Sequence, residues 1–185
     1  MSDANPWAPG ALDRIRELIN TRFIEQGTDA VATPAALEAW LRERDLLPPG
    51  EALGPADVAE LQAAREALRE LAALNHGAPL GDDARAVLAR IGARAHASFA
   101  CAADGALSLQ AVDGGIAGVI ARLLKIVYDA QRDGTWSRFH VCARATCRWA
   151  FYDHTKNRSA QWCEMSVCGN REKARRRRTR ARTAA

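Results

Sequence analysis

Apolar residues recur every three or four positions along most of residues 11–134, a spacing that places them on one face of an α-helix. The pattern predicts helices over residues 11–25, 34–47, 55–74, 82–95 and 116–134. In the first of these predicted helices, we expect the apolar face to extend to Phe23. Helix-end signals support the bounds, since Thr33 is a good N-cap ahead of Pro34, and Gly27 and Gly77 follow helices.

The period changes to two over residues 97–112, which indicates β-structure. Phe99 and Cys101 fall on one arm and further apolar residues on the other, with Asp104-Gly105 at the turn, so we predict a β-hairpin. A lone two-stranded hairpin is marginally stable, so we expect it to pack on the helices, with Cys101 as a buried thiol. The predicted fold class is α+β, mainly α.

At 185 residues and 48% hydrophobic content, the chain is long enough to bury an apolar core. Its N-terminus lacks the basic start and apolar stretch of a signal peptide. The most apolar run, residues 114–128, contains Arg122 and Lys125 and is too short to cross a bilayer. We expect a cytoplasmic protein without a membrane partner, in which clustered cysteines suggest metal or redox chemistry more than disulfides.

The formal net charge of +4 conceals an uneven distribution of charge. From Arg138 to the end there are 13 Lys and Arg residues against 3 acidic ones, a net charge of +10. Residues 1–137 hold 13 basic and 19 acidic residues, a net charge of −6. The asymmetry predicts a basic C-terminal module with a polyanionic partner. Asp133-Gly134 ends the last helix of the acidic part, so we predict two domains, residues 1–135 and 136–185.

Four of the five cysteines lie in the basic module as two equally spaced pairs. Cys142, Cys147, Cys163 and Cys168 follow the pattern C-x4-C-x15-C-x4-C, which is close to the common zinc spacings. Four thiolates fill the tetrahedral coordination of one zinc ion, so we expect a closed, structural site in a segment too small for its own core. An iron–sulfur cluster accepts the same four thiolates, whereas two disulfides are disfavoured in the cytoplasm.

The other residues near the cysteines have simpler interpretations. His140 and His154 are expected in packing or on the surface, because four thiolates need no further ligand. Aromatic side chains are predicted to cover the metal, with stacking on nucleic-acid bases as the alternative use. These side chains are Trp149, Phe151, Tyr152 and Trp162.

The segment CARATCRWAFYDHTKNRSAQWCEMSVCGNREKARR, residues 142–176, resembles the CGNR zinc-finger family. Its most specific part is Cys168-Gly169-Asn170-Arg171. The resemblance implies that the four cysteines bind zinc. The family usually carries arginines just before Trp162, where this chain has Ala160 and Gln161.

The rest of the chain is similar to the ABATE domain, which precedes this finger in bacterial proteins described as stress-induced transcriptional regulators. The similar segments are ELINTRF, ATPAALEAWL and AAREALRELAAL, followed by the hairpin in the expected order. The resemblance implies a helical N-terminal domain joined to a zinc finger in a transcription regulator.

Eight basic residues and one acid, Glu172, lie between Arg171 and Arg182, and Asn170 is a candidate N-cap for a helix over them. A solubilising, disordered tail is the alternative for a bare arginine run. Attachment to a zinc module favours nucleic-acid contact, since a rigid module positions arginines against phosphates and base edges. The residues predicted to contact nucleic acid are Arg148, Lys156, Arg158, Arg171, Lys173, Arg175, Arg176, Arg177, Arg178, Arg180 and Arg182.

Asn20, Thr21 and Arg65 are polar residues within otherwise apolar helical patterns, and they form a candidate pocket for a small ligand that controls the finger. The alternative is that Asn20 and Thr21 end a helix with backbone partners, and that Arg65 lies in a surface ion pair. No Ser-His-Asp set, carboxylate pair or phosphate loop stands out, so we expect no enzyme activity.

The sequence favours a zinc-dependent, DNA-binding transcription regulator whose N-terminal domain senses a ligand or mediates assembly, for example as a homodimer. The alternative is an interaction module that binds RNA or a protein through the finger and tail. Arginine density alone does not choose between DNA and RNA, because both present the same backbone phosphates.

Overall fold

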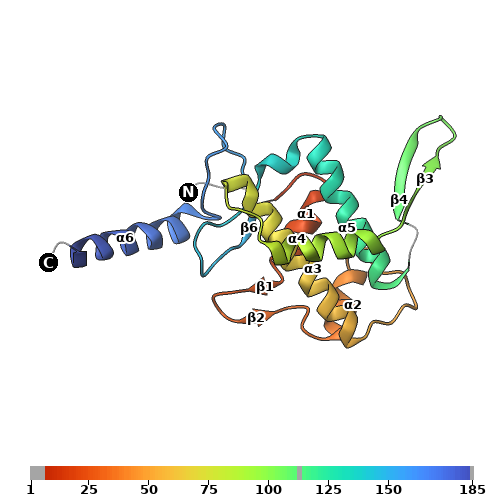
Figure 1. Cartoon of the computed structure of the whole chain (residues 1–185), viewed down its shortest axis with the longest axis horizontal. Helices are drawn as coiled ribbons and strands as arrows, with labels where there is room; N and C mark the ends of the chain where they lie inside the picture. Colours follow the sequence, from red (N-terminus) through yellow and green to blue (C-terminus); the bar gives the residue numbers. More distant parts are fainter. Residues whose placement is uncertain (1–6, 112–113, 184–185) are drawn as a thin grey trace.

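The computed structural model describes residues 7–111 and 114–183, apart from the side chains of Arg182 and Thr183. Val112, the predicted end of the hairpin, and the side chain of Arg182 therefore lie outside the described residues. Figure 1 shows a helical body from which a β-hairpin and the C-terminal helix project on opposite sides.

The body contains α1 (Leu12–Ile19), α2 (Pro34–Arg42), α3 (Pro55–Ala73), α4 (Asp82–Arg94) and α5 (Gly115–Arg132). The antiparallel strand pairs are β1 (Arg22–Phe23) with β2 (Thr28–Asp29), β3 (Ala97–Cys101) with β4 (Leu107–Ala111), and β5 (Phe139–Val141) with β6 (Ala150–Tyr152). A helical turn, Met165–Gly169, leads into α6 (Asn170–Thr183). These elements confirm the predicted α+β class, with helix in excess.

Two helices end earlier than predicted. Helix α1 ends at Ile19, where the Thr21 amide and hydroxyl both donate to the carbonyl oxygen of Leu18, at 3.1 and 2.7 Å, and the chain then turns into β1. Phe23 lies in that strand and does not extend the helical face. Helix α2 ends at Arg42, and Asp45 beyond it adopts a positive φ of 55°, which a helix does not allow.

The hydrophobic core lies between α1, α3 and α5, and it extends beyond the helices. Ile15, Leu61 and Leu123 each expose 1% or less of their surface. Residues after position 135 belong to the same cluster, namely Trp136, Phe139, Val141 and Ala150. The β5–β6 pair, which adjoins the first two cysteines, is therefore packed directly on the helical body.

The β3–β4 hairpin forms as predicted, with Phe99 opposite Leu109 and Cys101 opposite Leu107. The prediction that it packs on the helices is wrong for its outer part, since Phe99 is 78% and Leu107 is 71% exposed. Cys101 is also exposed, and not a buried thiol as predicted. These side chains are exposed because β4 contacts α5, while the outer part of the hairpin extends away from the body (Figure 1).

Among the described residues, no helix combines the length and the apolar character needed to cross a membrane. Helix α5, which contains most of the apolar run noted in the sequence, is instead a core helix with Val119, Ile120 and Leu123 buried.

Candidate metal centre and nucleic-acid interface

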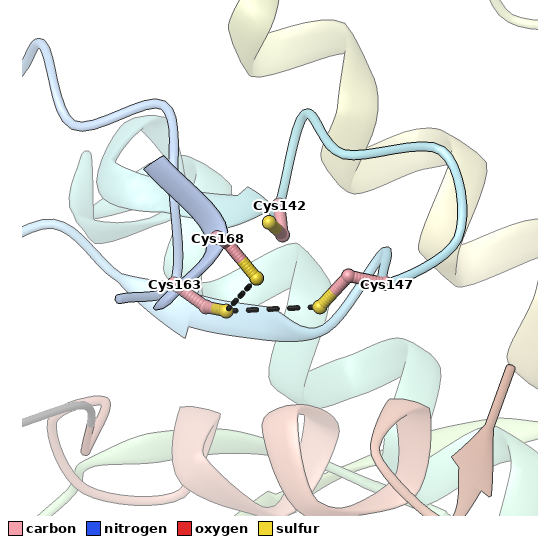
Figure 2. Close-up of side chains that lie close together, drawn as sticks. All are labelled: Cys142, Cys147, Cys163 and Cys168. Carbon is pink, nitrogen blue, oxygen red and sulfur yellow. Dashed lines mark hydrogen bonds between the residues drawn. The ribbon is translucent and has the colours of Figure 1, made fainter. Parts of the chain in front are cut away.

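Four cysteine sulfurs converge between the β5–β6 pair and the start of α6 (Figure 2). Cys142 directly follows β5, Cys147 lies in the loop before β6, Cys163 precedes the Met165–Gly169 turn, and Cys168 lies within it. All four Sγ atoms are within 4.8 Å of one another. The Sγ atom of Cys163 lies 3.7 Å from that of Cys147 and 3.7 Å from that of Cys168. The fold thus brings the four predicted ligands together.

This donor set fits one structural zinc ion. Thiolates at the usual Zn–S distance of about 2.3 Å occupy the corners of a tetrahedron with edges of about 3.8 Å. The 3.7 Å separations agree with that geometry. All five cysteines are free thiols, so the sulfurs are not consumed by disulfides. A bound zinc ion would cross-link the two halves of the module, and four protein ligands would leave it no open position for a substrate.

The charges of the sulfur cluster also suit a cation. Hydrogen bonds from the thiols of Cys147 and then Cys163 lower the pKa of Cys142 to about 2, while the hydrogen bond to Cys142 raises the pKa of Cys147 to about 12. The pKa of Cys163 is raised by its hydrogen bonds with the same two cysteines. A divalent cation bound by all four sulfurs would stabilise every ligand as a thiolate.

Backbone hydrogen bonds shape the loop that holds the first cysteine pair. The Cys142 amide donates to the carbonyl oxygen of Trp149 at 2.9 Å, and the Cys147 amide donates to that of Arg144 at 2.9 Å. Arg148 then adopts a positive φ of 50° as the chain returns to β6. The loop is joined to the second cysteine pair because the Ala143 amide donates to the carbonyl oxygen of Gln161 at 2.9 Å.

The turn that carries Cys168 is wider than an α-helical turn. The amides of Cys168 and Gly169 both donate to the carbonyl oxygen of Glu164, at 2.9 and 3.3 Å. A Cβ atom on Gly169 would collide with the Sδ atom of Met165 and lie 3.0 Å from Cδ1 of Trp162. A side chain at this position of the CGNR motif would therefore have to displace the end of Met165 and press on Trp162.

The prediction that Asn170 is an N-cap is wrong. Asn170 has helical dihedral angles, φ −67° and ψ −40°, and its side chain donates to the carbonyl oxygen of Ser166 at 3.0 Å. The helical path already begins at Met165, with Glu164 in an extended conformation before it. The start of α6 is thus continuous with the turn that positions Cys168.

The histidines lie outside the cysteine cluster. His140 is 2% exposed and stacks on His76, with ring centroids 3.9 Å apart. Burial and then the neighbouring His76 lower the pKa of His140 to about 4, so this packing residue is neutral at pH 7. His154 is exposed, with Nε2 2.9 Å from the carbonyl oxygen of Trp7.

The aromatic residues around the cysteines have different neighbours. Trp149 lies edge-on to Phe23 of β1, with ring centroids 5.5 Å apart, and Trp162 packs beside Gly169. Phe151 packs against His140, and Tyr152 packs against the hydrophobic core. The aromatic side chains therefore connect the segment that carries the cysteines with the helical body.

Two buried polar side chains of the helical body hold the first cysteine loop. Asn20 exchanges two hydrogen bonds with the backbone of Ala150. Arg69, 2% exposed in α3, donates to the carbonyl oxygens of Arg148 at 2.9 Å and Ile19 at 2.8 Å. Arg69 is not among the residues predicted from sequence, although an arginine on the buried side of a helix, three residues after Glu66, signals an internal ion pair.

The three candidate ligand-binding residues, Asn20, Thr21 and Arg65, do not share one set of partners. Arg65 is 1% exposed, so the alternative of a surface ion pair is wrong; it pairs with Asp29 through two hydrogen bonds of 2.8 and 2.7 Å. It also donates to the Thr21 hydroxyl at 2.9 Å. Burial raises the pKa of Asp29, but hydrogen bonds from Arg65 and from the Val31 amide outweigh it, and the pKa lies below its ordinary value. The structure thus joins Thr21 to Arg65 and places Asn20 against β6.

Helix α6 presents most of the predicted nucleic-acid contacts. Arg171 pairs with Glu25, whereas Arg175 and Arg176 pair with Glu172. Exposed residues of α6 without an ion pair in the described part of the chain are Lys173, Arg177, Arg178 and Arg180. Lys156 and Arg158 are exposed in the loop after β6, and Arg148 is half-buried. The exposed positive charge is therefore concentrated on a projecting helix (Figure 1).

Four convergent thiols from a β-turn loop and a helix start are the ligand set of a zinc finger. The family model "CGNR zinc finger" matches residues 138–181. The ABATE family model, whose description is "Putative stress-induced transcription regulator", matches residues 12–130. Since that match covers more than half of the chain, the chain belongs to the ABATE family, here joined to a CGNR zinc finger. No curated protein matches the chain.

Proposed function

We propose that this chain is a cytoplasmic transcription regulator that binds duplex DNA through α6 and the adjoining loops of the metal centre. The observation that carries the proposal is that a basic helix continues directly from the turn holding Cys168. A helix fixed at one end by a metal site can direct arginines to phosphates and to guanine edges in the major groove. Duplex DNA is therefore the favoured polyanion.

For the N-terminal domain we propose control of this contact by a small ligand. A hollow lies between the β1–β2 hairpin and α3, lined by side chains that include Arg22, Asp29, Gln62 and Arg65. Convergent charged groups in a concavity are typical of a site for a polar ligand. Because Asp29 belongs to β2, a ligand in the hollow would act on the hairpin that contacts the finger.

The DNA-binding proposal is tested with the full-length, zinc-loaded protein and a labelled duplex. Fluorescence anisotropy between 50 and 200 mM salt should give a steep log–log dependence, with a slope of roughly −5 for about six phosphate contacts. Replacing four basic residues of α6 with glutamine should reduce the steepness by about 3 to 4, since each lost phosphate contact removes about 0.9. The four residues are Lys173, Arg177, Arg178 and Arg180.

A matched control removes the same charge elsewhere. Arg85, Arg90, Arg94 and Arg132 are exposed residues of α4 and α5, and their replacement with glutamine should leave the slope nearly unchanged. Displacement of the duplex by an equal concentration of single-stranded RNA would favour the RNA-binding alternative. Zinc-loaded protein that binds no duplex at low salt would contradict the proposal.

A further inference from the structure

Glu25 joins the N-terminal domain to two arginines of the zinc finger. It lies in the turn between β1 and β2, far in sequence from its partners. Arg144 donates to both of its carboxylate oxygens, at 3.0 and 2.8 Å. Arg171, in the first turn of α6, donates to the same two oxygens, at 3.1 and 3.3 Å. One carboxylate is thus held by two guanidinium groups.

The β1–β2 hairpin is fixed at several points, so this contact is built into the fold. Next to the turn, Phe23 packs edge-on against Trp149. At the base, Asp29 of β2 pairs with the buried Arg65 of α3. The carboxylate of Glu25 is consequently presented to the finger by a supported turn.

The contact lies at an open pocket beside the metal centre. Phe23, Glu25, Arg144, Trp149 and Arg171 line it together with three of the cysteines. The exposed fraction of the side chain is 17% for Arg144, 38% for Glu25 and 55% for Arg171. A ligand could therefore reach the guanidinium groups from solvent once the carboxylate moves.

Two convergent guanidinium groups suit a phosphate as well as they suit a carboxylate, because both anions accept paired N–H donors. We infer that Arg144 and Arg171 form a binding site for one backbone phosphate of nucleic acid, and that Glu25 is the internal anion competing for it. This inference rests on the proposed function. On this inference Arg144 belongs to the nucleic-acid interface. The ABATE domain, through Glu25, inhibits the phosphate contact that Arg144 and Arg171 make.

Competition between a carboxylate and a phosphate has a measurable consequence. Glu25→Gln keeps the shape of the side chain but removes its charge, so both arginines become available to DNA. Partly exposed ion pairs are individually weak, so we expect duplex affinity at about 100 mM salt to rise about five- to tenfold. The magnitude of the log–log salt slope should rise by about 0.9, the value for one additional phosphate.

The matched control is Glu43→Gln, which makes the same change of net charge at a residue whose side chain is 74% exposed and paired with Arg44 of the helical body. It should change affinity by less than twofold. The double variant Glu25→Gln/Arg171→Gln should lose the gain, and so should Glu25→Gln/Arg144→Gln. Zinc content and Tm are measured for each variant to verify folding.

The outcomes separate this inference from the proposed function. If wild-type protein binds duplex and Glu25→Gln binds no more tightly than Glu43→Gln, the inference fails and the function stands. A lowered Tm in Glu25→Gln without tighter binding would assign Glu25 a purely structural role and would also overturn it. If all variants fail to bind duplex at low salt, both are wrong.

Discussion

Asn20 and Ala150, 130 positions apart in the chain, pair as if they belonged to neighbouring β-strands. The Asn20 side chain donates to the carbonyl oxygen of Ala150 at 2.9 Å and accepts from its amide at 2.7 Å. All of these groups are buried. The end of α1 therefore satisfies the free edge of β6, and the zinc finger is attached to the helical body by hydrogen bonds as well as by apolar packing.

Asn20→Ala should destabilise the whole protein. It leaves the buried N–H and C=O groups of Ala150 without partners, and each unsatisfied group costs about 1–3 kcal/mol. We expect the free energy of unfolding, measured with urea, to fall by about 2–4 kcal/mol. Asn157→Ala, at an exposed loop position, is the control and should stay within about 0.5 kcal/mol of wild type. Equal stability of the two variants would contradict a role for Asn20 in the attachment.

Cys163→Ser should abolish stoichiometric zinc binding, because a closed four-thiolate site loses one of its corners. The α6 end of the module should unfold, while far-UV circular dichroism retains most of the helical signal of the body. Cys101→Ser is the matched control, since that thiol is exposed on the β3–β4 hairpin and outside the cluster. Metal analysis by mass spectrometry should therefore find zinc in the control alone; equal zinc content would rule out this site.

Gly169→Ala should weaken zinc binding and lower the Tm, because the added methyl group meets Met165 and lies 3.0 Å from Trp162. Gly92→Ala in α4 is the control, and it should raise the Tm slightly. No atom outside the adjoining part of the helix lies within 4 Å of its new Cβ, and alanine is the better helix former by up to about 1 kcal/mol. A chelator competition assay and thermal denaturation measure the two effects. A Gly169→Ala variant as stable as wild type would contradict this prediction, because it would show that the Met165 side chain moves aside at no cost.

Asp29→Asn should destabilise the protein at neutral pH by about 2 kcal/mol, since it weakens the charge-assisted hydrogen bonds to the buried Arg65. The pKa of Asp29 is lowered on folding, so its contribution is fully present above its unfolded value of 3.8 and is lost as the pH falls through the folded pKa. The difference from wild type should therefore shrink below about pH 4. Urea denaturation from pH 3 to 7 measures it.

The control for that pH dependence is Asp82→Asn, whose carboxylate is 92% exposed. An exposed ion pair contributes about 0–1 kcal/mol, so this variant should follow the wild-type profile closely. A constant difference between Asp29→Asn and wild type at all pH values would contradict the ion-pair interpretation.

The sequence by itself determined the helical body, the two hairpin arms within residues 97–111 and the four metal ligands. Apolar periodicity and cysteine spacing are local properties, and a zinc ion tolerates few ligand sets, so both can be recognised without knowing the fold. The amino-acid sequence also located the basic segment, because its charge is concentrated in one short stretch, but it left open whether that stretch is a helix or a disordered tail.

Only the tertiary structure decided which polar groups are internal partners. The sequence places Arg65 and Arg69 among the apolar positions of a helix but does not name their partners, which β2 and the first cysteine loop supply by folding over α3. Asn20 and Glu25 find their partners more than a hundred residues later in the chain. Such contacts depend on which distant segments pack together, and local sequence patterns do not predict that packing. For the same reason sequence alone marked Arg171 as a nucleic-acid contact, whereas the fold shows Glu25 already bound to it.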